Sequence, residues 1–461
     1  KLKATRIEAC SRLIAAHPSR DEDLAKLFDL RAAAHSDNDD PSAAADDLGV
    51  ALRMRPPSAG ALVNRGAVHF RGGDTEAALK DFNDATVLDP KNAAARLWRG
   101  RAYRKLQQFD NAQADLDAAV TLDPKDPNVW LVRGLLRDDQ KRFADAIKDY
   151  DQSAVLAPDS VWPIYNRAWS KIQLNRHKEA LADLDACHKL NPELADCFDL
   201  RGDALAALDD HKGAFAAYSQ AIARDPQTAR LYKSRAAAAR KGGDFDGAIR
   251  DLTKAFELDT EMETLYDRGW LYSISGRPDN AIADYSLILR REGADNWPSA
   301  LIERGLARIV RGDLKAAEDD FASARAVAPT SVRAALWRAA LNIRLNRDSF
   351  WASWRRSGAA AALAQQRPKF KAEKYEAPFV QAILGERGVA EANRVAHIAA
   401  KKAEDPQDAA CFADAMAGVL ALAEGDAKGA ETYFAKAAAR AYPASYSCMI
   451  ATAELNRIRN R

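Results

Sequence analysis

Apolar and small residues recur along this chain with a period of 34 residues. Gly66 corresponds to Gly100 in the next repeat, and Ala78 corresponds to Ala112. Within a repeat, apolar residues lie three and four positions apart, which predicts two amphipathic helices. A polar turn at residues 71–75 separates these helices. The pattern therefore predicts a helix–turn–helix repeat whose copies stack on one another.

A proline follows the second helix of most repeats, at the same period: Pro56, Pro90, Pro124, Pro158, Pro192 and Pro226. Thr260 takes the next place, and Pro329 ends a later repeat. Proline cannot continue a helix, so each proline marks a boundary. Nine repeats are expected over residues 25–331, at 25–58, 59–92, 93–126, 127–160, 161–194, 195–228, 229–261, 262–297 and 298–331.

A 34-residue helix–turn–helix repeat with glycine, alanine and aromatic residues at these places resembles the tetratricopeptide repeat (TPR) family. The resemblance implies an all-α fold, a right-handed α-solenoid of stacked repeats. It also implies that the first helix of each repeat lines the concave face, where ligands of the family usually bind.

The two ends of the chain depart from the regular pattern. Residues 1–24 are expected to form an N-terminal capping helix. Residues 332–410 are expected to be an irregular helical segment, because Trp351 and Trp354 stand where small and aspartate residues belong. Residues 411–461 are expected to hold a final TPR-like repeat, built on Gly418, Ala430, Phe434 and Ala437, and a C-terminal helix. This layout resembles bacterial exported TPR adaptor proteins.

An arginine precedes the small residue of the first helix in ten repeats: Arg31, Arg65, Arg99, Arg133, Arg167, Arg201, Arg235, Arg268, Arg304 and Arg338. An aspartate follows sixteen residues later in all but the repeats of Arg201 and Arg338: Asp47, Asp81, Asp115, Asp149, Asp183, Asp251, Asp284 and Asp320. Binding of a ligand, such as a nucleic acid along a stripe of arginines, would explain the arginines but not the recurring aspartates. Because opposite charges recur together, we favour a structural ladder of ion pairs that sets register more than stability.

The composition limits the classes of function. The chain of 461 residues has 68 Lys and Arg against 66 Asp and Glu, a net charge of +2, so nothing drives it globally towards nucleic acid. No apolar run approaches the ~20 residues of a transmembrane helix. Catalytic and metal-binding signatures such as HExxH, GxSxG or a Walker loop are absent from the sequence. We expect a non-enzymatic protein without a cofactor or metal.

The TPR resemblance places candidate binding residues at fixed positions of the first helices. These are Trp98, Arg101, Arg104, Trp162, Tyr165, Asn166, Trp169, Asp199, Asp203, Arg230, Lys233, Tyr266 and Trp270. Aromatic anchors flanked by both charges suit a protein or peptide partner. The alternative is that Trp162 and Trp169 are covered by neighbouring helices. A second functional alternative is an accessory or regulatory subunit of an enzyme or envelope complex, which uses residues 332–410 or the convex face.

Five cysteines leave the compartment open. Cys187 and Cys197 flank a turn, and Cys411 and Cys448 lie about one repeat apart, so either pair can reach bridging distance. Two disulfides would fit a periplasmic or exported protein, with Cys10 left over. Buried reduced thiols in a cytoplasmic protein are the alternative.

Overall fold

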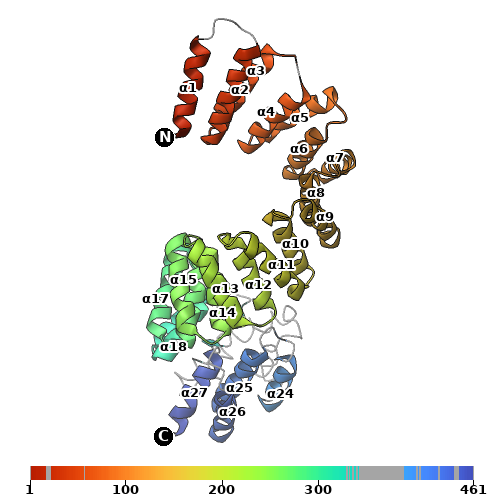
Figure 1. The fold of residues 1–461 in the computed structure, drawn as a ribbon. Helices are drawn as coiled ribbons and strands as arrows, with labels where there is room; N and C mark the ends of the chain where they lie inside the picture. Colours follow the sequence, from red (N-terminus) through yellow and green to blue (C-terminus); the bar gives the residue numbers. More distant parts are fainter. Residues whose placement is uncertain are drawn as a thin grey trace. The chain divides into compact units, whose positions relative to one another are not determined.

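The computed structural model describes residues 2–16, 22–56, 58–328, 331, 333–334, 337–338, 341, 389–400, 403, 406–423, 426–440 and 446–459. Every regular element in these residues is an α-helix, as Figure 1 shows. Trp351 and Trp354, and most of the irregular segment expected at residues 332–410, lie outside the described residues.

The chain divides into two compact bodies, each of which is described by itself. The N-terminal body spans Lys1–Arg224. Its helices are α1 (Leu2–Ala16), α2 (Glu22–Asp37), α3 (Pro41–Met54), α4 (Ala59–Arg71), α5 (Thr75–Leu88), α6 (Ala93–Lys105), α7 (Phe109–Leu122), α8 (Pro127–Asp139), α9 (Phe143–Leu156), α10 (Val161–Gln173), α11 (His177–Leu190), α12 (Ala195–Ala207) and α13 (His211–Arg224).

The C-terminal body spans Asp225–Arg461. Its described helices are α14 (Ala229–Lys241), α15 (Phe245–Asp259), α16 (Met262–Ile274), α17 (Pro278–Glu292), α18 (Pro298–Arg311), α19 (Leu314–Val327), α24 (Val389–Ala400), α25 (Pro406–Ala423), α26 (Ala427–Ala439) and α27 (Tyr446–Arg459).

Each body is an α-solenoid in which every helix packs on its neighbour in sequence. The two helices of a repeat form antiparallel pairs such as α2/α3, α4/α5 and α14/α15, and each pair packs on the next. First helices also touch the following first helix, as α4 touches α6. The expected all-α solenoid is thereby confirmed.

Polar side chains start many of these helices, and a left-handed residue ends many of the first ones. Ser58, Asp74 and Asn92 accept the hydrogen bond of a backbone N–H in the first turn of α4, α5 and α6. Seven turn residues spaced by 34 have φ between 57° and 90°: Asp39, Gly73, Gln107, Lys141, Asn175, Asp209 and Gly243. This conformation closes the first helix and reverses the chain.

Helices within a repeat approach closely where a glycine faces a large side chain. A Cβ atom on Gly66 would lie 2.5 Å from Cε1 of Phe82, and one on Gly134 would lie 2.5 Å from Cε1 of Tyr150. Phe82 and Tyr150 are fully buried and have no room to withdraw. The same contact recurs in the last repeat between Gly418 and Phe434. The small residue at this position therefore sets the distance between the paired helices.

The arginine–aspartate pairs bridge the two helices of a repeat. All eight arginines with an aspartate sixteen residues later donate two hydrogen bonds to it, at 2.5–3.1 Å. The aspartates are buried, with Asp149 1% exposed. The hydrogen bond to Asp115 raises the pKa of Arg99, so the guanidinium stays charged.

Several of the same arginines also reach the preceding repeat. Arg133 donates to Asp117 at 2.9 Å, and Arg167 donates to Asp151 at 2.7 Å. The two exceptional arginines have other partners: Arg201 pairs with Asp185, and Arg338 with Glu318. The ladder therefore links successive repeats as well as the helices within one.

Both predicted cysteine pairs form disulfides. Cys187–Cys197 joins α11 to α12, and Cys411–Cys448 joins α25 to α27. All four residues are buried, and Cys10 is a free cysteine. Cys187 occupies the repeat position that Ala85 and Ala119 hold in earlier repeats. The disulfide therefore replaces a small buried side chain and leaves the packing of the paired helices as it is in the other repeats.

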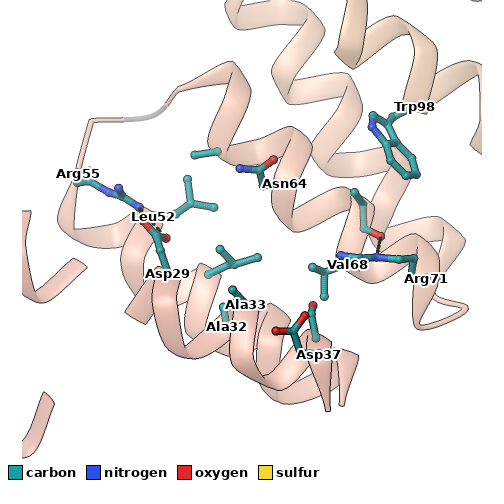
Figure 2. A pocket seen from close by; sticks show the side chains of 14 residues that line it. Asp29, Ala32, Ala33, Asp37, Leu52, Arg55, Asn64, Val68, Arg71 and Trp98 are labelled. Carbon is teal, nitrogen blue, oxygen red and sulfur yellow. Dashed lines mark hydrogen bonds and ion pairs between the residues drawn. The ribbon is translucent and has the colours of Figure 1, made fainter. Parts of the chain in front are cut away.

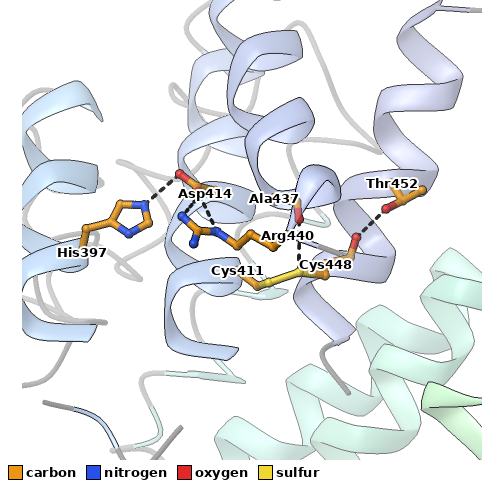
Figure 3. Close-up of a disulfide and its surroundings, with 7 residues drawn as sticks. All are labelled: His397, Cys411, Asp414, Ala437, Arg440, Cys448 and Thr452. Atoms are coloured by element: carbon orange, nitrogen blue, oxygen red, sulfur yellow. Dashed lines mark hydrogen bonds and ion pairs between the residues drawn. A yellow bond between two sulfur atoms is a disulfide. The ribbon is translucent and has the colours of Figure 1, made fainter. Parts of the chain in front are cut away.

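A buried aspartate beside the second disulfide connects three helices of the C-terminal body (Figure 3). Asp414 is 1% exposed and contacts His397 Nε2 at 2.9 Å, Arg440 at 2.8 Å and Asn393 at 3.1 Å. Burial acts to raise the pKa of Asp414, but the hydrogen bonds outweigh it and the pKa is lowered. The cluster ties α24, α25 and α26 together.

The close contact between paired helices can be tested within α4. We expect Gly66→Ala to lower the free energy of unfolding by about 1–3 kcal/mol, because its Cβ would overlap the ring of Phe82. Gly60→Ala is the matched control, since a Cβ there meets nothing within 4 Å and alanine favours the helix by up to about 1 kcal/mol. Urea unfolding would measure both. Equal stability of the two variants would contradict the proposed role of Gly66.

Candidate partner-binding surface

Four helices of the N-terminal body enclose a hollow of about 670 Å³ (Figure 2). Its lining comes from α2, α3, α4 and α6: Asp29, Ala32, Ala33, Ser36, Asp37, Leu48, Leu52, Arg55, Ala61, Asn64, Ala67, Val68, Arg71 and Trp98. The floor is apolar, and Asn64 presents an exposed amide to the opening. Such a hollow suits an apolar side chain with polar groups beside it.

Charges at the two ends of this hollow differ. At the α2 end, Asp29 and Arg55 form an ion pair at 2.7 Å. At the α6 end, Arg71 donates to the backbone oxygen of Ala67 at 3.4 Å, and within the described part of the chain it forms no ion pair. The α2 end is therefore neutralised, while the α6 end is cationic.

Trp98 lies at the centre of an aromatic and cationic group at the α6 end. Its ring lies 6.0 Å from that of Phe70, and the guanidinium of Arg101 lies 4.3 Å above it. The ammonium of Lys105 lies 5.0 Å from the Phe70 ring. Burial, together with the charge of Arg104, lowers the pKa of Arg101. Two predicted binding residues, Trp98 and Arg101, therefore lie side by side.

Arg104, also predicted to bind a partner, is engaged within the fold. It forms an ion pair with Asp139 on α8 at 2.6 Å.

Aromatic residues on α10 differ in accessibility. Trp162 is 49% exposed and meets Tyr165 edge to face at 6.2 Å. Trp169 packs on Phe143 at 5.7 Å, and Asn166 donates to the backbone oxygen of Trp162 at 2.8 Å. The packing alternative therefore describes Trp169, whereas Trp162 remains available to solvent.

The aspartates predicted on α12 are not presented freely. Asp199 is only 5% exposed, and Asp203 accepts a hydrogen bond from Tyr218 at 2.7 Å. Tyr218 is itself buried, so its hydrogen bond holds Asp203 against the core of the repeat.

A second hollow, of about 390 Å³, lies among α14, α15, α16 and α18 of the C-terminal body. It brings together three predicted binding residues, Lys233, Tyr266 and Trp270. Arg240 lies 5.4 Å from the Trp270 ring. Arg230 is exposed on α14 but does not line this hollow.

Lys233 and Glu303 of the second hollow form ion pairs within the fold. Lys233 contacts Asp259 and Glu261, each at 2.5 Å. Glu303 is 3% exposed and pairs with Arg333 at 2.8 Å. This hollow has mixed polarity, unlike the α6 end of the first.

The family model for the tetratricopeptide repeat matches residues 30–93, 97–161 and 165–229. These ranges cover the helix pairs that carry the ladder in the N-terminal body. These three ranges of the chain are TPR repeats. No curated protein matches it significantly.

Several solved structures are similar to this TPR protein. A TPR protein from Parabacteroides merdae is 20% identical, with 51% of this chain and 93% of that chain covered and a TM-score of 0.42. YrrB, titled a TPR protein with an unusual peptide-binding site, is 16% identical, with 40% and 94% covered and a TM-score of 0.35. Human IFIT1, solved as a dimer with m7Gppp-AAAA, is 13% identical, with 71% and 94% covered and a TM-score of 0.40.

Among the described residues, the TPR protein has no group of three histidine, cysteine, aspartate or glutamate residues placed to hold a metal ion. None of its described helices is long and apolar enough to cross a membrane.

Arg71 and Phe70 were not among the residues predicted from the family positions. A signal for Arg71 exists, because it stands 34 residues before Lys105 and so occupies the equivalent place. Phe70 is identified as part of this surface only by its contact with Trp98, a residue of the next repeat.

A buried carboxyl group lies where the first helices of two repeats meet. Asp138 accepts hydrogen bonds from the hydroxyls of Tyr150 at 2.6 Å and Ser170 at 2.7 Å. Burial raises the pKa of Asp138 to about 6, although these hydrogen bonds act to lower it. Asp138 stands 34 residues after Arg104, a predicted binding residue, but it is 8% exposed and belongs to the core.

Asp138 should make stability depend on pH. Its folded pKa, about 6, exceeds the unfolded value, so the folded state binds more protons between about pH 4 and 6 and loses stability as the pH rises through that range. We expect Asp138→Asn to remove this loss and to be more stable than the native protein near pH 7, by up to about 3 kcal/mol.

Urea unfolding across this pH range would measure the effect. Asp139→Asn, on the surface of the same helix, is the control. A stability difference between Asp138→Asn and the native protein that does not change with pH would contradict the assignment.

Proposed function

We propose that this TPR protein is a non-enzymatic scaffold that binds a polypeptide partner on its first helices. The observation that carries the proposal is the hollow lined by α2, α3, α4 and α6, with Trp98 and Arg101 at its end. Tryptophan and arginine are the residues that most often dominate the energy of protein interfaces. Because the helices are already formed, a partner would lose little free energy in ordering the site.

Selection of random displayed peptides would test this function. We expect the native protein to enrich peptides, and Arg101→Ala to weaken the binding of those peptides by about tenfold or more, as at an interface hot spot. Trp270→Ala would report separately on the second hollow. Val87→Ala is the control, because Val87 is 78% exposed on the second helix α5.

Circular dichroism would establish that each variant keeps the native helicity. Failure to enrich any peptide would contradict the function. Peptides that bind all variants equally would instead favour the alternative, an accessory or regulatory subunit that uses residues 332–410 or the second-helix face.

We also propose that the protein works in an oxidising compartment, as an exported or periplasmic protein. The support is the pairing of four of its five cysteines in buried disulfides. A cytoplasmic protein would hold these thiols reduced.

Counting thiols would test the compartment. In protein trapped with acid from the cells that make it and then unfolded, we expect a maleimide to label Cys10 alone before reduction. After reduction all five cysteines should react. Labelling of all five without reduction would contradict an oxidising compartment.

A further inference from the structure

We propose that the TPR protein binds an acidic peptide segment at the α4–α6 patch, with an apolar side chain of the segment seated in the adjoining hollow. The α4–α6 patch consists of Phe70, Arg71, Trp98, Arg101 and Lys105. The inference rests on the proposed function and names the class of partner for that site.

The two helices that form the patch contain no acidic residue. α4 reads AGALVNRGAVHFR, and α6 reads AAARLWRGRAYRK with five basic residues. They lie next to each other as the first helices of consecutive repeats. The positive charge of this surface is therefore concentrated on two adjacent helices, although the net charge of the whole chain is only +2.

Some of these cations form ion pairs with carboxylates of the fold, and others do not. Arg99 and Arg96 contact Asp115, and Arg104 contacts Asp139. For Arg71, Arg101 and Lys105, no carboxylate lies within 4 Å among the residues that the structure describes. Of these three cations, Arg101 and Lys105 lie over the rings of Trp98 and Phe70, and Arg71 follows Phe70 at the end of α4.

Arg101 is partly shielded from water by its contact with Trp98, at 4.3 Å. A guanidinium in such a place is more weakly hydrated than one in solvent and gains more from a carboxylate. Arginine also binds carboxylates through two parallel hydrogen bonds. Arg101 is therefore suited to an acidic side chain of a partner, with Lys105 and Arg71 adding attraction.

An apolar part of the ligand is indicated by the hollow that shares Arg71 and Trp98 with the patch. Its floor includes Leu48, Leu52 and Val68. A side chain placed there would exchange water for apolar contacts beside the cations. The partner segment is thus an acidic peptide with an apolar anchor.

A nucleic acid is the competing occupant, because arginine and aromatic rings also bind bases. Asp37, the last residue of α2, also lines the hollow, so a phosphate backbone that followed the groove would meet a carboxylate. A peptide that is acidic on one side only meets no such repulsion. Charge complementarity therefore favours the peptide.

The experiment uses the peptides selected by displaying a random library to the full chain. We expect those from the native protein to be enriched in aspartate and glutamate next to an apolar residue. For a selected peptide, Arg101→Gln together with Lys105→Gln should weaken binding by about tenfold or more. The control, Arg53→Gln with Lys80→Gln, removes the same charge from α3 and α5 and should change binding by less than about twofold.

A second measurement does not depend on the variants. A twin peptide with glutamine and asparagine in place of its acidic residues should bind the native protein about tenfold more weakly, and added salt should reduce the difference. A labelled oligothymidylate provides the nucleic-acid arm.

The outcomes separate this inference from the proposed function. Selected peptides without acidic enrichment, or an amide twin that binds equally well, would overturn the inference and leave the function standing. Binding of the oligothymidylate that is lost in the Arg101 and Lys105 variant, while the selected peptides still bind that variant, would overturn it in favour of a nucleic acid. The absence of any selected peptide would overturn both.

Discussion

A guanidinium held between helices by buried carboxylate oxygens is the interaction on which the arrangement of repeats depends. Each ladder arginine joins the two helices of its own repeat, and Arg133 and Arg167 also reach the preceding one. The desolvation cost of such a pair offsets much of its attraction, so its main contribution is geometric. A slipped helix would leave a buried aspartate such as Asp149 without its cation. The ladder thus specifies register while the apolar core supplies most of the stability.

The ladder accounts for the arginine that recurs at one position in every repeat. Eight of these ten arginines are paired with an aspartate on the second helix of their own repeat. Arg71, Arg101 and Lys105 do not belong to the ladder, and Arg101 and Lys105 lie over the rings of Trp98 and Phe70. The ladder arginines are bound by carboxylates within the fold, whereas these cations can bind a partner. They identify the α6 end of the first hollow as the candidate binding site. In the second hollow, Lys233 and Arg333 are matched by carboxylates, while Arg240 lies beside Trp270.

Departures from the repeat coincide with added cross-links. The repeat of Arg201 has lost its usual aspartate, and the Cys187–Cys197 disulfide enters the same repeat. In the C-terminal body, where the 34-residue period lapses, the Cys411–Cys448 disulfide and the Asp414 cluster connect α24 to α27. A disulfide limits the freedom of the unfolded chain, and a satisfied buried aspartate fixes side chains in place. The disulfides and the Asp414 cluster therefore hold helices together where the regular contacts between repeats are altered.

The sequence by itself determined the helical solenoid, the repeat period and the pairing of arginine with aspartate. These features are local and periodic: helix patterns repeat within about four residues, and the charges recur at a constant separation. Only the tertiary structure decided which candidate residues are accessible. Trp98 and Arg101 lie together beside a hollow, whereas Asp199 is buried and Arg104 is paired with Asp139, because accessibility depends on the bulk and charge of side chains from neighbouring repeats. Asp138 shows the same limit, since its burial needs Tyr150 and Ser170 from two other helices. The disulfides, too, were a choice between alternatives until the helices placed their sulfur atoms together.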